Sequence, residues 1–244
     1  MPTLPLASPQ KMRLILASTS PRRQELLRAI GLSFSIVPPT GVDETPLPGE
    51  APADLVQRLS RLKAQAVATN LAQLAPPIKS STEVKPQPII IIAADTEVAF
   101  EGHILGKPGN PAAAAAMLQQ LRGRCHQVYS GLTIASLPST SVDPLHDGIF
   151  ITRLHQSQVW MRAYSQADIA AYVASGDPLD KAGAYAIQHE GFTPVERLEG
   201  CFASVMGLPL GELAAACQEL GLGLPEIGLL CAGYTGYPCC QNNR

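Results

Sequence analysis

Two stretches of the chain place charged side chains where the expected local structure disfavours their charge. The first, LILASTSPRRQELL over residues 14–27, runs from an apolar strand pattern through three hydroxyl residues and a proline to Arg22 and Arg23. Ser20 and Pro21 are favoured residue types at a helix N-cap and at the first helical position. Because a helix N-terminus attracts anions and disfavours cations, the arginines are either ordinary solvated charges or ligands of a phosphate.

The second stretch, IIIIAADTEVAF over residues 89–100, predicts a buried strand that is broken by Asp95. A carboxylate at the end of such an apolar run is costly unless it is paired or used in chemistry. Lys63 lies at the margin of the apolar stripe of a helix expected from Ala53 to Leu74, formed by Leu55, Val56, Leu59, Leu62 and Ala66. Its ammonium is either on the surface or reaches a cleft along its apolar stem.

Other polar residues can be explained by purely structural roles. Asp180 and Lys181 fit a local ion pair, and Gln188 fits a residue that satisfies backbone groups in a turn. His103 and His126 are expected in loops, since no second histidine stands at metal-ligand spacing. Asp95 is the residue for which a purely structural interpretation is hardest to sustain.

Composition restricts the class of protein. The 244 residues are 46% hydrophobic with a formal net charge of −2, which is typical of a globular protein and not of a general nucleic-acid or membrane-surface binder. No apolar stretch is long enough to span a membrane, and the N-terminus lacks the apolar core of a signal peptide. We therefore expect a cytoplasmic protein whose six cysteines are free thiols.

The alternation of strand and helix patterns predicts an α/β fold. Helices are expected over residues 21–30, 53–74, 112–121 and 166–174, and from Pro209 to Gly221, with Asn110 and Ser165 as N-caps. One domain is expected over residues 12–221, preceded by a disordered leader (1–11), interrupted by a proline-rich connector (75–88) and followed by an appended tail (222–244). Two groups of elements on either side of the connector favour a cleft between two lobes.

Seven motifs then carry a resemblance: LASTSPRRQELL, VDE, LKAQA, AADT, LGKP, DKAGAYAIQ and GLPL. In this order they resemble the Maf family of nucleoside triphosphate pyrophosphatases, also called septum formation inhibitors, over about Met12 to Leu220. The resemblance implies the Maf/Ham1-like (inosine triphosphatase-like) α/β fold, with a mixed central sheet, flanking helices and a cleft between lobes. The segment EGCFASVM, with Cys201 and Phe202, departs from the family pattern.

The resemblance also implies roles for individual residues. Asp95 matches the proton acceptor. Arg22, Thr96 and Gln188 match the positions that set base specificity, and their types fit the dTTP/UTP subgroup. The matching polar positions that line the cleft are Ser18, Arg23, Glu44, Lys63, Lys107, Asp180 and Lys181.

The expected activity is hydrolysis of dTTP, UTP or modified pyrimidine nucleotides to a monophosphate and pyrophosphate. A triphosphate needs several fixed cations and usually a divalent metal. Glu44 and Asp95 offer the hard oxygen ligands that suit Mg²⁺ or Mn²⁺; whether Asp95 is base, ligand or both stays open. The alternative is a non-catalytic nucleotide-binding regulator of cell division. The expected partner is the nucleotide, without nucleic acid or membrane, and a homodimer is compatible with this interpretation.

Overall fold

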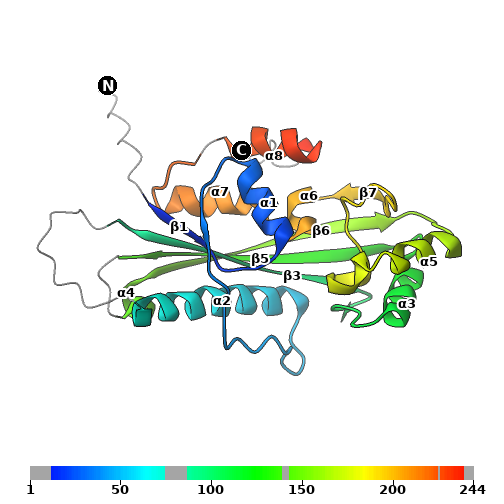
Figure 1. Cartoon of the computed structure of the whole chain (residues 1–244), viewed down its shortest axis with the longest axis horizontal. Helices are drawn as coiled ribbons and strands as arrows, with labels where there is room; N and C mark the ends of the chain where they lie inside the picture. The colour runs from blue at the N-terminus through cyan, green and yellow to red at the C-terminus, as the bar shows by residue number, and fades with distance from the viewer. Residues whose placement is uncertain (1–11, 75–86, 139–142, 225, 239–244) are drawn as a thin grey trace, which may run out of the picture.

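The computed structural model of the protein describes residues 12–74, 87–138, 143–224 and 226–238. Its centre is a seven-stranded mixed sheet of order β2-β1-β3-β5-β6-β7, with β4 paired to β3 (Figure 1). The strands are β1 (Arg13–Leu16), β2 (Ser35–Ile36), β3 (Ile89–Phe100), β4 (His103–Ile104), β5 (Cys125–Leu137), β6 (Ile149–Met161) and β7 (Val195–Glu199). β1 is parallel to β2 and β3, and the remaining pairs are antiparallel. The expected α/β class is confirmed.

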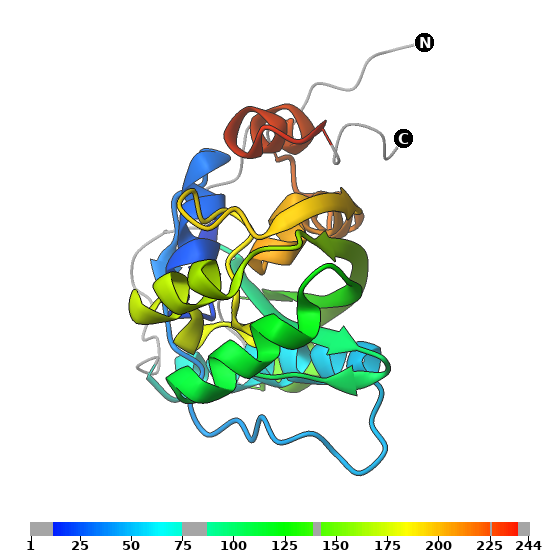
Figure 2. The ribbon, with the colours of Figure 1, turned by 90° about the vertical axis from the view of Figure 1, so that its right-hand side faces the viewer.

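Helices cover both faces of this sheet. They are α1 (Pro21–Ala29), α2 (Pro52–Leu74), α3 (Pro111–Leu121), α4 (Pro144–Asp147), α5 (Gln166–Ala174), α6 (Phe202–Met206), α7 (Leu210–Glu219) and α8 (Ile227–Thr235), with short 3₁₀ turns η1 (Asp177–Asp180) and η2 (Ala182–Ala184). α2 lies along one face, whereas α1, α7 and α8 lie over the other, and α3 and α5 gather at the far end (Figures 1 and 2).

Two lobes share the long strands. Near β1 the sheet is sandwiched between a cluster under α1, α6, α7 and α8 and a smaller cluster under α2. A third cluster joins the far ends of β3, β5 and β6 to α3 and α5. β3 and β5 run through both lobes, paired without interruption from Ile89↔Leu137 to Ala99↔Gln127. Asp95 therefore lies inside a continuous strand, and the prediction that it breaks the strand is wrong.

Two N-caps are confirmed and one is corrected. The Asn110 side chain accepts from the Ala113 N–H at 2.9 Å, and Ser165 forms a full capping box with Asp168. Ser20 occupies the N-cap position of α1, but its side chain makes no capping hydrogen bond. Its own N–H instead donates to Ser18 Oγ at 3.1 Å. The first turn of α1 is consequently not closed by its N-cap side chain.

The buried face of α2 differs from the predicted stripe. Leu62 is 36% exposed, whereas Lys63 is 7% exposed and lies among the buried positions. Hydrophobicity scales predict lysine at the surface, but here an ion-pair network described below stabilises the buried ammonium. The helix is therefore turned so that Lys63, not Leu62, faces the sheet.

The C-terminal segment also differs from expectation. The sequence pattern predicts only an appended tail after residue 222, because apolar periodicity fades there. α8 nevertheless forms in this segment, and its Ile227 and Cys231 are buried in the same cluster as α7. The leader 1–11, most of the 75–88 connector and Cys239–Cys240 lie outside the described residues.

Candidate functional site

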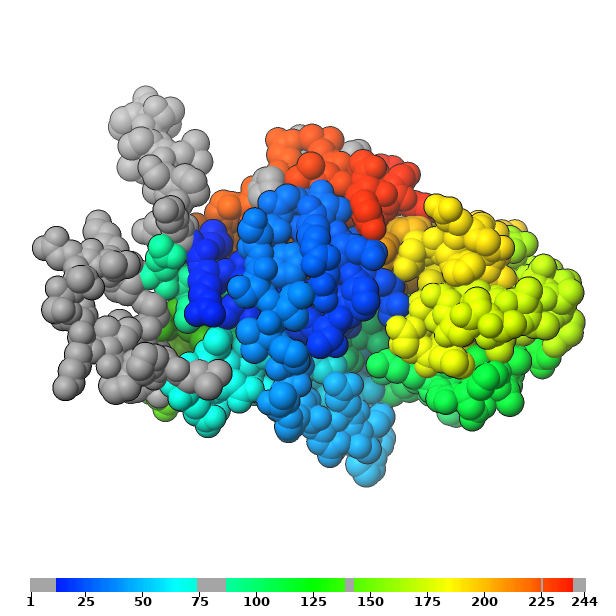
Figure 3. Space-filling model, in the orientation of Figure 1, coloured from blue at the N-terminus to red at the C-terminus, as the bar shows by residue number. Residues whose placement is uncertain are grey.

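A cavity of about 400 Å³ lies between the lobes. Figure 3 shows the blue α1 segment of one lobe next to the yellow segment of the other. Every site residue predicted from the sequence lines this cavity: Ser18, Arg22, Arg23, Glu44, Lys63, Asp95, Thr96, Lys107, Asp180, Lys181 and Gln188. The fold thus brings together side chains from seven separate stretches of the chain; their roles remain predictions.

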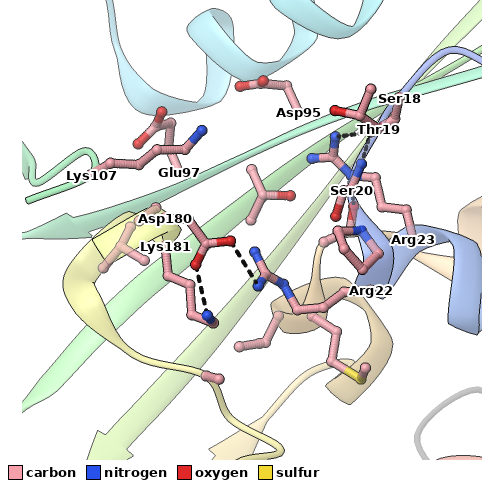
Figure 4. A pocket seen from close by; sticks show the side chains of 18 of the residues that line it. Ser18, Thr19, Ser20, Arg22, Arg23, Asp95, Glu97, Lys107, Asp180 and Lys181 are labelled. Atoms are coloured by element: carbon pink, nitrogen blue, oxygen red, sulfur yellow. Dashed lines mark hydrogen bonds and ion pairs between the residues drawn. The ribbon is translucent and has the colours of Figure 1, made fainter. Parts of the chain in front are cut away.

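One wall is the start of α1. Arg23 Nε donates to the Gly207 carbonyl at 2.8 Å, and its Nη1 donates to Ser18 Oγ at 3.2 Å (Figure 4). Burial lowers the pKa of the Arg23 guanidinium, and the nearby Asp95 charge opposes this shift. Held in this way, Arg23 keeps a fixed positive charge beside the uncapped first turn of α1, which is the arrangement of an anion site.

The opposite wall contains a buried ion-pair network. Lys63 Nζ lies 2.6 Å from Asp95 Oδ1 and 2.9 Å from Glu44 Oε1. The Lys63 and Asp95 side chains are each 8% exposed, whereas Glu44 is 55% exposed. Asp95 Oδ2 has no hydrogen-bond partner in the described part of the chain. One carboxylate oxygen of Asp95 is therefore fixed by Lys63, and the other has no partner within the described ranges.

A glycine permits this network. Gly131 is the cross-strand partner of Asp95, and a Cβ added there would lie 2.1 Å from the Val56 carbonyl oxygen of α2. No real Cβ tolerates such a contact. α2 consequently approaches the sheet beside Asp95 closely enough for the Lys63 ammonium to reach the carboxylate.

Glu97 is a residue that the sequence analysis missed. It lines the same cavity two positions after Asp95 in β3, hence on the same face of the strand. Burial and the Asp95 charge raise the pKa of Glu97 to about 7, while Lys107 and Lys63 act in the opposite direction. Period-two alternation from Asp95 was the signal that could have found it.

The second lobe adds η1 and its flanking residues. Arg22 Nη1 lies 3.7 Å from Asp180 Oδ2 and so connects α1 to this lobe (Figure 4). The buried Lys181 donates to the Asp177 carbonyl and carboxylate and to Asp180 Oδ1, which uses its three donors. Lys107, by contrast, has no carboxylate oxygen within 4.0 Å of its ammonium nitrogen among the described residues. Lys107 is therefore freer than Lys181 to bind an anion.

The remaining lining of the cavity is uncharged and combines polar with apolar side chains. Gln188 Oε1 is buried without a partner in the described residues. Thr96 Oγ1 lies 2.9 Å from Ser130 Oγ on the neighbouring strand. Below them Tyr185, which lines the cavity, contacts the buried His126, whose Nε2 is 2.8 Å from Tyr185 Oη. His126 thus lies inside β5 and His103 begins the short strand β4, so the loop positions predicted for both histidines are wrong.

The fold and the cavity define an α/β protein with a cleft suited to a phosphorylated ligand: cations from both lobes at its walls, carboxylates on a central strand, and a part lined by uncharged side chains. Residues 13–220 match the family described as Maf-like protein. The chain belongs to the Maf family.

Relatives in this family align along most of the chain. A dTTP/UTP pyrophosphatase of Methylobacillus flagellatus is 42% identical over 213 residues, covering 87% of this chain and 95% of the relative. A dTTP/UTP pyrophosphatase of Pelotomaculum thermopropionicum is 38% identical over 208 residues, covering 85% and 96%.

Solved structures give more distant likenesses. A nucleoside-triphosphatase (dITP/XTP pyrophosphatase) from Mycobacterium abscessus has 14% identity and a TM-score of 0.35, covering 85% of this chain and 95% of that one. A HAM1 protein from Coxiella burnetii has 13% identity and a TM-score of 0.38, covering 85% and 99%. Among the described residues, no helix combines the length and apolar character needed to cross a membrane.

Proposed function

We propose that this chain is a nucleoside triphosphate pyrophosphatase that hydrolyses dTTP and UTP to the monophosphate and pyrophosphate. The observation that supports this best is the convergence of all predicted site residues on one cavity between the lobes. The dTTP/UTP pyrophosphatase names of the relatives agree with it. Removal of unwanted pyrimidine nucleotides is the role that follows from such an activity.

The cavity separates two tasks. Arg23, tied to Ser18 and Gly207 beside the uncapped start of α1, suits the phosphates. Arg22 reaches across to Asp180 and lines the cavity together with Thr96 and Gln188. In this proposal it contacts the base. This division assigns Arg23 to phosphate binding and Arg22 to specificity.

Asp95 is the proposed proton acceptor. Its Oδ1 is held by Lys63, and its Oδ2, which has no partner in the described part of the chain, is available to a water molecule. In the proposed step this water attacks the α-phosphorus, Asp95 takes a water proton, and the bond from the α-phosphorus to the bridging oxygen breaks. The bridging oxygen leaves with the pyrophosphate, and the water oxygen stays on the monophosphate.

A divalent cation fits the carboxylate set. Asp95 and Glu97 each present one oxygen that has no hydrogen-bond partner among the described residues, whereas the predicted ligand Glu44 forms an ion pair with Lys63. The described residues contain no group of three His, Cys, Asp or Glu side chains arranged for a metal, but Mg²⁺ often takes one or two carboxylates and fills its other positions with water and phosphate oxygens. Asp95, with Glu44 or Glu97, would hold Mg²⁺ or Mn²⁺. When bound, such an ion supplies charge neutralisation for the phosphates.

A nucleotide panel tests the proposal. Purified protein is incubated with dTTP, UTP, CTP, GTP and 7-methyl-GTP and with Mg²⁺ or Mn²⁺, and pyrophosphate and orthophosphate are measured separately. Pyrophosphate release from dTTP and UTP is expected. Nucleotide binding without any release would instead favour the regulator, and release of single orthophosphates would indicate a phosphatase.

An Asp95→Asn variant tests the assigned base. The amide keeps the shape of the side chain but cannot accept the water proton, so turnover should fall by at least about 10²-fold. Affinity for a non-hydrolysable dTTP analogue should stay within about tenfold, a change of about 1.4 kcal/mol. Full activity would refute the role of Asp95.

A further inference from the structure

The hydroxyl of Thr96 takes part in a short chain of hydrogen bonds that leads away from the cavity. Thr96 Oγ1 is 2.9 Å from Ser130 Oγ, and Ser130 Oγ is 2.8 Å from the backbone carbonyl oxygen of Ser204 in α6. Ser130 is completely buried and is the direct cross-strand partner of Thr96. These hydrogen bonds therefore join β3, β5 and α6 behind one wall of the cavity.

The direction of this chain follows from counting hydrogens. A carbonyl oxygen only accepts, and a serine hydroxyl has a single hydrogen. If Ser130 donated to Thr96, its oxygen and the Ser204 carbonyl oxygen would face each other at 2.8 Å with no hydrogen between them. Both short contacts contain a hydrogen only when Ser130 donates to Ser204 and Thr96 donates to Ser130.

This direction determines what Thr96 offers to a ligand. Its one hydrogen points away to Ser130, so only oxygen lone pairs remain for a group in the cavity. We infer that Ser130 is a positioning residue for base specificity: it fixes Thr96 as a hydrogen-bond acceptor, which suits the imide N3–H of uracil or thymine. This inference rests on the proposed function and on the predicted place of Thr96 at the base.

The same arrangement disfavours cytosine. Cytosine carries a lone pair at N3 where uracil and thymine carry a hydrogen, so a base bound in the same pose would set N3 against the Thr96 lone pairs. A hydroxyl that is free to rotate would donate to cytosine N3 and accept from thymine N3–H equally well. Discrimination therefore depends on Ser130 and not on the presence of Thr96 alone.

Replacement of Ser130 by alanine tests this inference. Wild type and Ser130→Ala are compared by kcat/KM for dTTP and dCTP and by the Kd values of dTMP and dCMP from calorimetry. The dTTP/dCTP ratio should fall by about tenfold, the size expected when one hydrogen-bond preference is lost. A fall of both substrates by an equal factor, with the ratio unchanged, would overturn the inference.

A second pair of variants excludes a general packing effect. Thr133→Val removes another buried hydroxyl from β5, on the α2 side, where Thr133 contacts Ser60 and not the cavity. It should leave the substrate ratio unchanged. Thr96→Val should lower the ratio, and adding Ser130→Ala to it should change the ratio no further, because Ser130 acts through Thr96. Additive losses in the double variant would refute this coupling even if Ser130→Ala alone were poorly folded.

The test keeps two failures apart. If wild type releases pyrophosphate from no nucleotide, the proposed activity fails, but the dTMP and dCMP affinities still report on Ser130. If wild type prefers dTTP and Ser130→Ala keeps the same preference in both rate and affinity, only the inference about Ser130 fails.

Discussion

The buried His126 should make the stability of the fold depend on pH. The side chain is completely buried in β5, one ring nitrogen contacts Tyr185 Oη, and Nδ1 has no partner in the described residues. Burial lowers the pKa of His126 from 6.5 to about 4. Between these two values the unfolded chain binds a proton at this position and the folded chain does not, so stability from this group is present at neutral pH and is lost as the pH falls.

The magnitude follows from proton linkage. With a pKa of 6.5 in the unfolded chain and about 4 in the folded one, lowering the pH from about 7.5 to about 5 should reduce the free energy of unfolding by about 2 kcal/mol. Other groups contribute to the total pH dependence, so a variant must isolate this one. His126→Gln removes the titrating ring and keeps a hydrogen-bonding group for Tyr185.

Urea unfolding followed by circular dichroism at both pH values provides the measurement. The stability difference between wild type and His126→Gln should change by about 2 kcal/mol, with wild type losing more at the lower pH. His103→Gln, a substitution at an exposed histidine of β4, should follow the wild-type profile. Parallel profiles for wild type and His126→Gln would refute the reasoning, because they would mean that the ring titrates equally in the folded and unfolded chains.

Three further outcomes test the walls of the cavity. Arg22→Trp removes the link to Asp180 and should lower kcat/KM for dTTP and UTP more than for other nucleotides; an equal loss for all bases would make Arg22 a phosphate contact. Lys63→Met leaves the buried Asp95 carboxylate without its cation and should lower the free energy of unfolding by about 3 kcal/mol in denaturant titrations. The control is Lys107→Met, which breaks no ion pair within 4.0 Å among the described residues. It should lower the free energy of unfolding by less than about 1 kcal/mol. Gly131→Ala forces α2 away from the sheet and should lower the free energy of unfolding by about 1–3 kcal/mol, measured by thermal melting. Gly233→Ala in α8, where an added Cβ meets no atom within 4 Å, should leave the stability unchanged or raise it.

Much of the site could be predicted because short local motifs carry the resemblance to the Maf family, and that resemblance assigned most of the site residues. SPRR, AADT and AYAIQ each specify residue types at fixed spacing, and the structure places the matching residues around one cavity. Asn110 and Ser165 were also predictable, since capping depends on the residues next in the chain.

What could not be predicted depends on contacts between distant segments. The burial of Lys63 follows from Asp95 and Glu44 on other elements, and α8 forms a buried contact only because the core cluster under α7 receives Ile227 and Cys231. Ser130 is an unremarkable hydroxyl in the sequence; its part in the site needs both Thr96 and the Ser204 carbonyl in place.

The continuous pairing of β3 with β5 has a consequence for how the two lobes can move relative to each other. Lobes joined by a flexible linker can close around a ligand by rotation at a hinge, but here the two lobes share a ladder that is unbroken from Ile89 to Ala99. Rotation at that point would break hydrogen bonds between β3 and β5, so the shared sheet opposes a hinge motion of the two lobes. The part of the cavity that lies along β3 is accordingly preformed. The ladder holds Asp95 and Thr96 at fixed positions relative to Gly131 and Ser130, their partners on β5.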